Sequence, residues 1–237
     1  MVIKHDLEKL FGRVYKESDF VKKSYDILKD YGFKEDNAIA SVCVCRDEIS
    51  QTIMEHITKI WGLPFNFSSL AGLFTAGKTG MKAFISHAPK VDDRERYIYY
   101  AFSHVGIDEN GNIGVCSRRG IEKSHACGAL CKFLGELSSK KIDIALDEEN
   151  IEENIIKRRL LRKIPYGEIP DLLNLTKITL KVIKEDLENI IEKVIDTTKA
   201  DYAVFTGIQV HGPDGNYIAP DEAYVVINGK KQGLNNL

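Results

Sequence analysis

The first third of the chain alternates between helical and strand-like patterns of apolar residues. Residues 6–31 carry apolar side chains at intervals of three and four, which predicts two amphipathic helices. Residues 38–45 (AIASVCVC) form a short β-rich run bounded by charged residues, which is typical of a buried strand. Isoleucines at helical spacing then predict a helix that ends at Gly62: Ile49, Ile53, Ile57 and Ile60.

The middle of the chain continues this alternation. Residues 97–107 (YIYYAFSHVGI) predict a second buried strand, residues 108–112 a turn, and residues 113–117 a short return strand. Residues 124–137 predict a helix with Ser124 as its N-cap.

The last third predicts two helices, near 149–162 and 168–196, and two closing strands, over 201–212 and 222–229. Strands that alternate with helices indicate an α/β fold, in which helices cover a central sheet.

Size and charge narrow the class of protein. The chain has 237 residues, of which 43% are hydrophobic, enough for one domain with a sizeable core and a helical appendage. We therefore expect an N-terminal helical segment over residues 1–34 and an α/β domain over residues 35–237. The net charge is −2, so no nucleic-acid or membrane partner is indicated.

The location is expected to be cytoplasmic. No apolar run approaches the ~20 residues of a membrane span, and the charged N-terminus lacks a signal-peptide pattern. Five cysteines, an odd number, argue against a disulfide framework and favour metal binding or burial.

A glycine-rich stretch raises the possibility of nucleotide binding. Residues 72–79 (GLFTAGKT) fit the P-loop pattern G-x-x-x-x-G-K-[ST], which cradles phosphates between a strand and a helix. The preceding residues 64–71 make a poor strand, because Pro64 and a serine pair interrupt them. A P-loop nucleotide hydrolase and a plain turn before a helix both remain open at this point.

Two cysteines and a histidine lie where α/β sheets build their sites. Cys45 follows a predicted strand, His104 lies near the end of another, and Cys127 lies near the start of a predicted helix. Helix N-termini stabilise thiolates. Together these residues make a Cys₂His shell, which leaves a fourth zinc position open, as in catalytic zinc sites.

Several alternatives remain for these residues. Cysteine is among the most buried residue types, so each cysteine could belong to the core. Cys43, Cys127 and Cys131 could form a separate structural cluster, and His125 is a rival ligand. Asp47 could serve only as a helix N-cap.

Motifs around these residues resemble a known family. The chain is similar to limiting-carbon-dioxide-inducible (LCIB-type) proteins, the theta-class carbonic anhydrases related to the β-class. The resemblance covers roughly residues 36–132 and 200–226. Its motifs are CRDE (45–48), LAGLFTAGKTGMKAFISHAP (70–89), FSHVGIDENGNIG (102–114), ACGAL (126–130) and TGIQVHG (206–212).

The resemblance implies a mostly parallel central sheet, as in β-carbonic anhydrases, and a Zn²⁺ ion held by Cys45, His104 and Cys127. It implies reversible hydration of carbon dioxide to bicarbonate, for which zinc lowers the pKa of a bound water toward ~7 and so supplies zinc-bound hydroxide. A homodimer is also implied. In this family the glycine-rich stretch is a site-lining loop, and some members are inactive zinc-binding proteins.

Asp47 and Arg46 are the candidate catalytic residues. Asp47 could orient the hydroxide or, in an inactive form, occupy the fourth zinc position. The β-class arginine position, two residues after the aspartate, is Ile49 here. Arg46 precedes Asp47 and would point the opposite way on an extended chain, so Arg118 and Arg119 are further candidates.

Overall fold

A seven-stranded sheet forms the centre of the protein. The computed structural model describes residues 4–234 and residue 237. The strand order is β1-β8-β7-β4-β2-β3, and β9 pairs with the outer edge of β8. The strands of the sheet are β1 (Tyr15–Lys16), β2 (Ile39–Cys43), β3 (Phe65–Asn66), β4 (Glu95–Gly106), β7 (Ala200–Gly212), β8 (Gly215–Ile227) and β9 (Lys230–Gly233). Apart from it lies a two-stranded hairpin of β5 (Val115–Arg118) and β6 (Ile121–His125).

The central sheet is mostly parallel, as the resemblance implies. Strands β3, β2, β4 and β7 run in one direction. β8 is antiparallel to β7, to β1 and to β9, so β8 alone is reversed among the described strands of this sheet. The carboxyl ends of β2, β4 and β7 therefore meet at one edge, where open α/β sheets form their sites.

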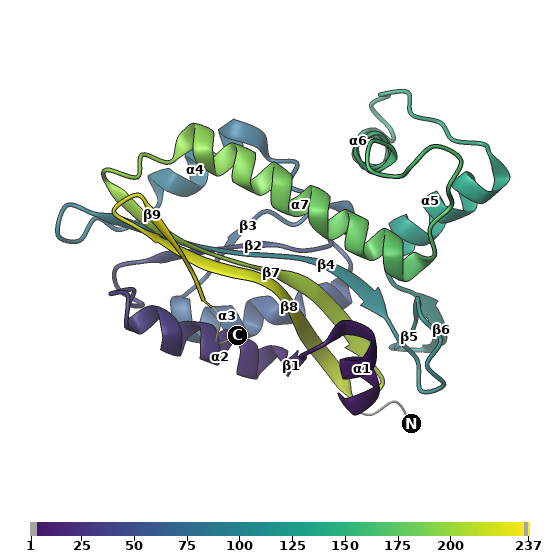
Figure 1. Cartoon of the computed structure of the whole chain (residues 1–237), viewed down its shortest axis with the longest axis horizontal. Coiled ribbons are helices and arrows are strands. Elements are labelled where there is room, and N and C mark those ends of the chain that lie inside the picture. The colour runs from purple at the N-terminus through teal and green to yellow at the C-terminus, as the bar shows by residue number, and fades with distance from the viewer. Residues whose placement is uncertain (1–3, 235–236) are drawn as a thin grey trace.

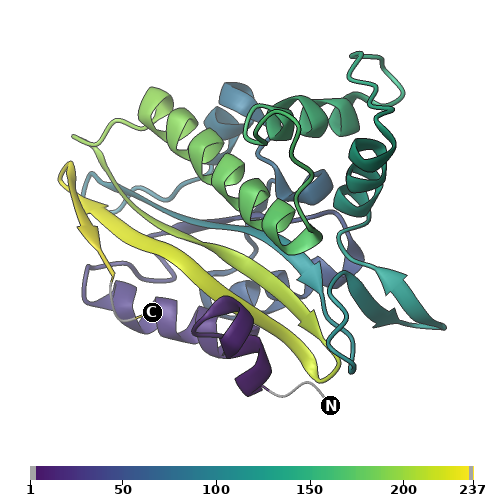
Figure 2. The same cartoon turned by 45° about the vertical axis from the view of Figure 1, so that its right-hand side comes forward.

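Helices cover both faces of the sheet (Figures 1 and 2). The helices are α1 (Lys4–Phe11), α2 (Glu17–Lys29), α3 (Thr52–Trp61), α4 (Gly77–Ser86), α5 (Gly128–Ser139), α6 (Ile151–Leu161) and α7 (Leu172–Val194), with short 3-10 turns η1 (Glu48–Ser50) and η2 (Leu70–Gly72). α2 and α3 bury Phe20 and Trp61 on one face, and α4 and α7 bury Phe84 and Leu187 on the other. Full burial of such a side chain stabilises the folded state by about 1.5–3 kcal/mol.

The N-terminal segment expected over residues 1–34 shares this core. Residues 1–3 lie outside the described part of the chain. From Lys4 onward the segment forms α1, β1 and α2; β1 pairs with β8, and α2 packs on the sheet.

Most elements expected from the apolar pattern are found, with shifted ends. For the helix expected over residues 124–137, the predicted start is wrong. Ser124 is not an N-cap, because it pairs with Cys116 in the β5–β6 hairpin, and α5 begins only at Gly128. The apolar pattern did not indicate β6 or β9, since both consist mainly of exposed polar residues.

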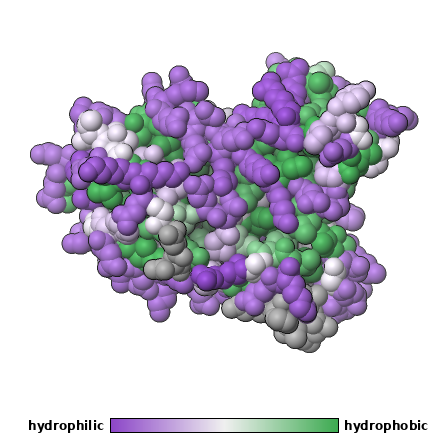
Figure 3. Space-filling view, in the orientation of Figure 1, coloured by the Kyte–Doolittle hydropathy of each residue, from purple (hydrophilic) through white to green (hydrophobic). Residues whose placement is uncertain are grey.

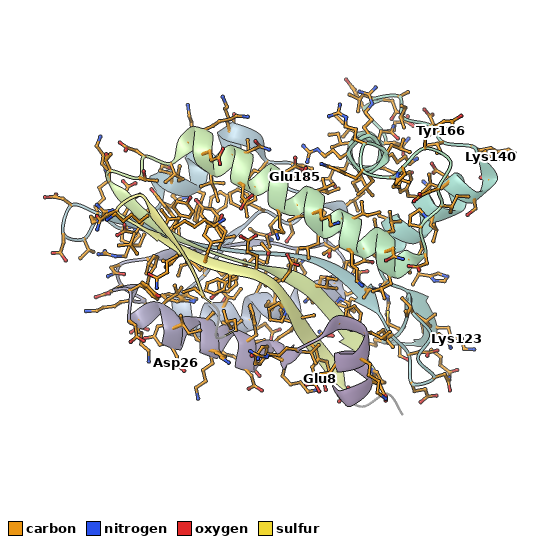
Figure 4. The ribbon with its side chains drawn as sticks, viewed as in Figure 1. Glu8, Asp26, Lys123, Lys140, Tyr166 and Glu185 are labelled. Carbon is orange, nitrogen blue, oxygen red and sulfur yellow. The ribbon has the colours of Figure 1, made fainter. Side chains whose placement is uncertain are left out.

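Polar side chains dominate the surface. In Figure 4 the labelled Asp26, Lys123, Lys140 and Glu185 point outward, and all four are exposed. Apolar side chains gather between α1 and the start of α7 in Figure 3, where residues including Phe11 line a hollow of about 710 Å³. Among the described helices, none combines the length and the apolar character that crossing a bilayer requires.

The glycine-rich stretch packs against the sheet beside the ends of β2 and β4. It begins at the last residue of η2, and β3 already ends at Asn66, so the strand that must lead into a P-loop is missing from this part of the structure. Gly72 has φ +74°, and a Cβ there would lie 2.6 Å from the carbonyl oxygen of Phe102. Gly77, with φ +60°, has open space around it.

This difference predicts unequal effects of alanine at the two glycines. Gly77→Ala should lower the free energy of unfolding by about 1–2 kcal/mol, the cost of a left-handed residue with a Cβ. Gly72→Ala adds a backbone clash and should cost about 1–3 kcal/mol more. Urea unfolding of both variants measures the difference. Equal losses would show that the close approach to Phe102 does not matter.

Candidate metal centre

Three buried donor side chains converge at the carboxyl edge of the sheet. Cys45 lies just beyond β2, His104 near the end of β4, and Cys127 at the N-cap position of α5. Their exposed fractions are 3%, 1% and 1%. One donor atom from each lies within 4.8 Å of the others, and the two Sγ atoms are 3.9 Å apart. The structure thus brings together the three residues that the sequence singled out as ligands.

The two thiols differ in acidity because they interact with one another. The Cys127 thiol donates to Cys45, and this bond, aided by the backbone N–H of Asp47, lowers the pKa of Cys45 to about 4 although burial opposes it. The same bond, together with burial, raises the pKa of Cys127. Backbone N–H groups of α5 also point at the Cys127 sulfur, as expected at a helix N-terminus.

His104 presents one ring nitrogen to the thiols and uses the other in a hydrogen bond. Its Nδ1 lies 3.0 Å from Nε2 of His211, whereas its buried Nε2 has no hydrogen-bond partner among the described residues. Tetrahedral zinc with Zn–S bonds of about 2.3 Å requires sulfurs about 3.8 Å apart. The sulfur separation and the unpartnered nitrogen fit a zinc ion with one position left open.

Asp47 is held by Arg118 at the rim of this cluster. The Arg118 guanidinium donates to both carboxylate oxygens, at 2.5 and 2.6 Å, and to the carbonyl oxygen of His125 at 2.9 Å. Burial alone would raise the pKa of Asp47, but the hydrogen bonds from Arg118 and its positive charge lower it overall. Asp47 also accepts a long 3.5 Å bond from the N–H of Ile49, so it caps η1 as well.

The other candidate arginines point elsewhere. Arg46 is 60% exposed and pairs with Glu152 of α6 at 2.8 Å. Arg119 is exposed on the turn between β5 and β6. Of the three arginines, Arg118 is therefore the one in contact with Asp47. Its position on a hairpin about seventy residues downstream explains why spacing could not single it out.

The rival ligands lie outside the cluster. His125 is exposed in β6. Burial raises the pKa of Cys43 to about 12, and its thiol points at the carbonyl oxygen of Gly72, 3.2 Å away. Within residues 4–234, Cys45, His104 and Cys127 are the group of this kind whose donor atoms meet.

Two polar residues behind His104 were missed from the sequence. His211 lies at the end of β7, and its Nδ1 is 2.9 Å from Oδ1 of Asn216 in β8. Burial lowers the pKa of His211 to about 3, so its ring is neutral. Parallel pairing of β4 with β7 brings His211 beside His104, and the local signal in the sequence was a polar pair, Gln209 and His211, in a mostly apolar stretch.

Solved structures with the same fold are known. The crystal structure of the limiting CO2-inducible protein LCIB is 34% identical in sequence, with a TM-score of 0.81 over 97% of each chain. The crystal structure of PtLCIB4, a homologue of LCIB, is 20% identical, with a TM-score of 0.83 over 96% of this chain and 97% of that one. A comparison with curated proteins gives no match.

The sequence comparison agrees with the structural one. Residues 14–227 match the family described as limiting CO2-inducible proteins B/C beta carbonic anhydrases. This match covers most of the described chain, including the donor cluster, Asp47 and Arg118. The protein therefore belongs to the LCIB-type family of β-carbonic anhydrases.

Proposed function

We propose that this protein is a zinc-dependent carbonic anhydrase that converts carbon dioxide and water reversibly to bicarbonate and a proton. The observation that carries the proposal is the convergence of Cys45, His104 and Cys127 in a chain of this family, with the His104 Nε2 atom left unpartnered. These three side chains would hold the ion. When bound, zinc lowers the pKa of a coordinated water and thereby makes a nucleophile available near neutral pH.

In this proposal, Asp47 and Arg118 orient the reacting groups beside the donor cluster. The Asp47 carboxylate is ionised and accepts hydrogen bonds, so it can fix the direction of an O–H group beside the donor cluster. The two-pronged contact with Arg118 restricts the carboxylate to one geometry. Restricting the reacting groups in this way lowers the entropic part of the barrier.

Apolar side chains around the cysteines suit a small apolar substrate. Phe67 and Leu73 belong to the same buried cluster as Cys45 and Cys127, and Leu70 packs against it. Such a wall excludes bulk water and strengthens the electrostatic interactions within the site. It offers carbon dioxide, which has no net dipole, a favourable environment.

A catalytically inactive zinc-binding protein is the second candidate. In such a protein the Asp47 carboxylate, which lies two residues after Cys45 and is held by Arg118, would close the metal shell. Zinc content combined with stopped-flow carbon dioxide hydration separates the candidates: zinc with turnover supports the enzyme, and zinc without turnover supports the inactive protein. A protein without zinc would contradict both. Homodimer formation and a cytoplasmic location stay predictions from the sequence.

Substitution of the cysteines tests the ligand set. Wild-type protein should contain about one zinc per chain, and Cys45→Ser or Cys127→Ser should lose it, because a hydroxyl is a poor ligand beside a thiolate. Cys43→Ser should keep the metal, since the Cys43 thiol points at the Gly72 carbonyl oxygen instead. Elemental analysis of the purified variants measures this. Loss of zinc in Cys43→Ser but not in Cys45→Ser would refute the assignment.

A matched pair of arginine variants tests which guanidinium supports Asp47. Arg118→Gln removes the two-pronged contact and should slow hydration by about 10²-fold, as expected for a misplaced reacting group, while zinc is retained. Arg46→Gln breaks an exposed ion pair worth about 0–1 kcal/mol and should change the rate little. The reverse order of effects, measured by stopped flow, would return the role to Arg46.

Replacing the Asp47 carboxylate by an amide separates its possible roles. Asn caps helices about as well as Asp, so a purely structural Asp47 predicts a silent Asp47→Asn variant. An orienting carboxylate predicts a rate loss of about 10²–10⁴-fold with zinc retained. A carboxylate that closes the metal shell predicts a variant that gains anion binding. Hydration rate, zinc content and iodide binding distinguish the three, and full activity would remove Asp47 from the mechanism.

A further inference from the structure

A chain of buried hydrogen bonds runs from His104 away from the donor cluster. His104 Nδ1 contacts His211 Nε2 at 3.0 Å, and His211 Nδ1 contacts Asn216 Oδ1 at 2.9 Å. The Asn216 amide nitrogen contacts Thr52 Oγ1 at 2.8 Å, and Thr52 Oγ1 contacts Glu17 Oε2 at 2.8 Å. His104, His211 and Glu17 are at most 3% exposed. These hydrogen bonds link α2, α3, β4, β7 and β8 in the protein interior.

The Asn216 amide sets the direction of this chain. Its nitrogen also donates to the carbonyl oxygen of Ile49 at 3.4 Å. A carbonyl oxygen only accepts, so the NH₂ group must face Ile49 and Thr52, and Oδ1 must face His211. The His211 Nδ1 atom therefore carries a proton, which it donates to Asn216.

The donor position on His211 in turn determines which ring nitrogen of His104 carries a proton. A neutral imidazole has one N–H, so the His211 Nε2 atom is an acceptor once Nδ1 is the donor. The His104 Nδ1 atom must then donate to it. The free lone pair of His104 consequently lies on Nε2, the buried ring nitrogen that has no hydrogen-bond partner among the described residues.

We propose that His211 is a positioning residue for the metal centre: with Asn216 it selects the His104 tautomer that can bind a metal through Nε2, and it holds that ring in place. The inference rests on the proposed zinc site. Hydrogen bonds behind a metal-binding histidine fix its tautomer and raise its basicity, and their loss typically costs 10–100-fold in metal affinity.

The hydrogen bonds at Glu17, the end of this hydrogen-bond chain farthest from His104, support the same donor direction. Glu17 accepts from the Thr52 hydroxyl and, at 2.5 Å, from the amide nitrogen of Gln209. The same Gln209 nitrogen also donates to the carbonyl oxygen of Ser50 at 3.1 Å, which keeps the amide in that orientation. Every bond in the chain thus donates away from His104 toward a carboxyl group, and such aligned bonds reinforce one another.

Two variants of His211 distinguish positioning from packing. His211→Leu keeps bulk but offers no acceptor, and it should weaken zinc binding 10–100-fold in a chelator competition. His211→Gln places an amide oxygen near the former Nε2 atom and should restore most of the affinity. His56→Gln is the control. The His56 side chain is partly exposed, its Nε2 lies 4.0 Å from Glu17 Oε2, and the variant should bind zinc as wild type does. Equal zinc affinity of wild type and His211→Leu would overturn the inference.

A second measurement uses the metal-free protein and so does not depend on zinc binding. Nitrogen-15 NMR of labelled histidines should show His211 protonated at Nδ1 only and a proton on Nδ1 of His104. His211 protonated at Nε2 would overturn the inference. A wild type with the expected protonation that binds no zinc would instead contradict the proposed function and leave the hydrogen-bond chain supported.

Discussion

Parallel pairing of β2, β4 and β7 is the constraint on which the rest of the site depends. Cys43 lies opposite Ala101, and His104 lies opposite Gln209, so the strands that precede Cys45, His104 and His211 end along one edge of the sheet. A slip of one residue would exchange the faces of a strand and bury Val44 where Cys45 now lies. The same apolar packing that stabilises the sheet therefore sets the positions of the donor atoms.

The chemistry of the site is divided between a dry interior and a charged rim. Sulfur and nitrogen donors lie among apolar side chains, where an ion would be strongly held because water cannot compete for it. Asp47 and Arg118 lie at the rim and are each about one-eighth exposed, at 12% and 13%. In the proposed enzyme, the buried donors would hold the ion, and the partly exposed rim would give the substrate access to it.

Local sequence predicted the donor residues, left Arg118 as one of three candidate arginines, and did not indicate His211. Cys45, His104 and Cys127 each lie next to a strand end or helix start, which apolar periodicity reveals. Arg118 and His211 reach the site only through the hairpin and the strand order, and neither is encoded in local spacing. The P-loop pattern misled for a related reason: Gly72 is required by close packing against Phe102, a contact between distant parts of the chain.

The location of Arg118 on the β5–β6 hairpin has an evolutionary consequence. The hairpin forms a sheet of its own, separate from the strands that precede Cys45 and His104, although β6 leads directly to Cys127. Replacing the arginine side chain alone would still leave the backbone that carries the three donor residues in place. In the proposed enzyme, turnover and metal binding would depend on different side chains, so a related chain could keep the ion and lose the reaction while the fold stays the same.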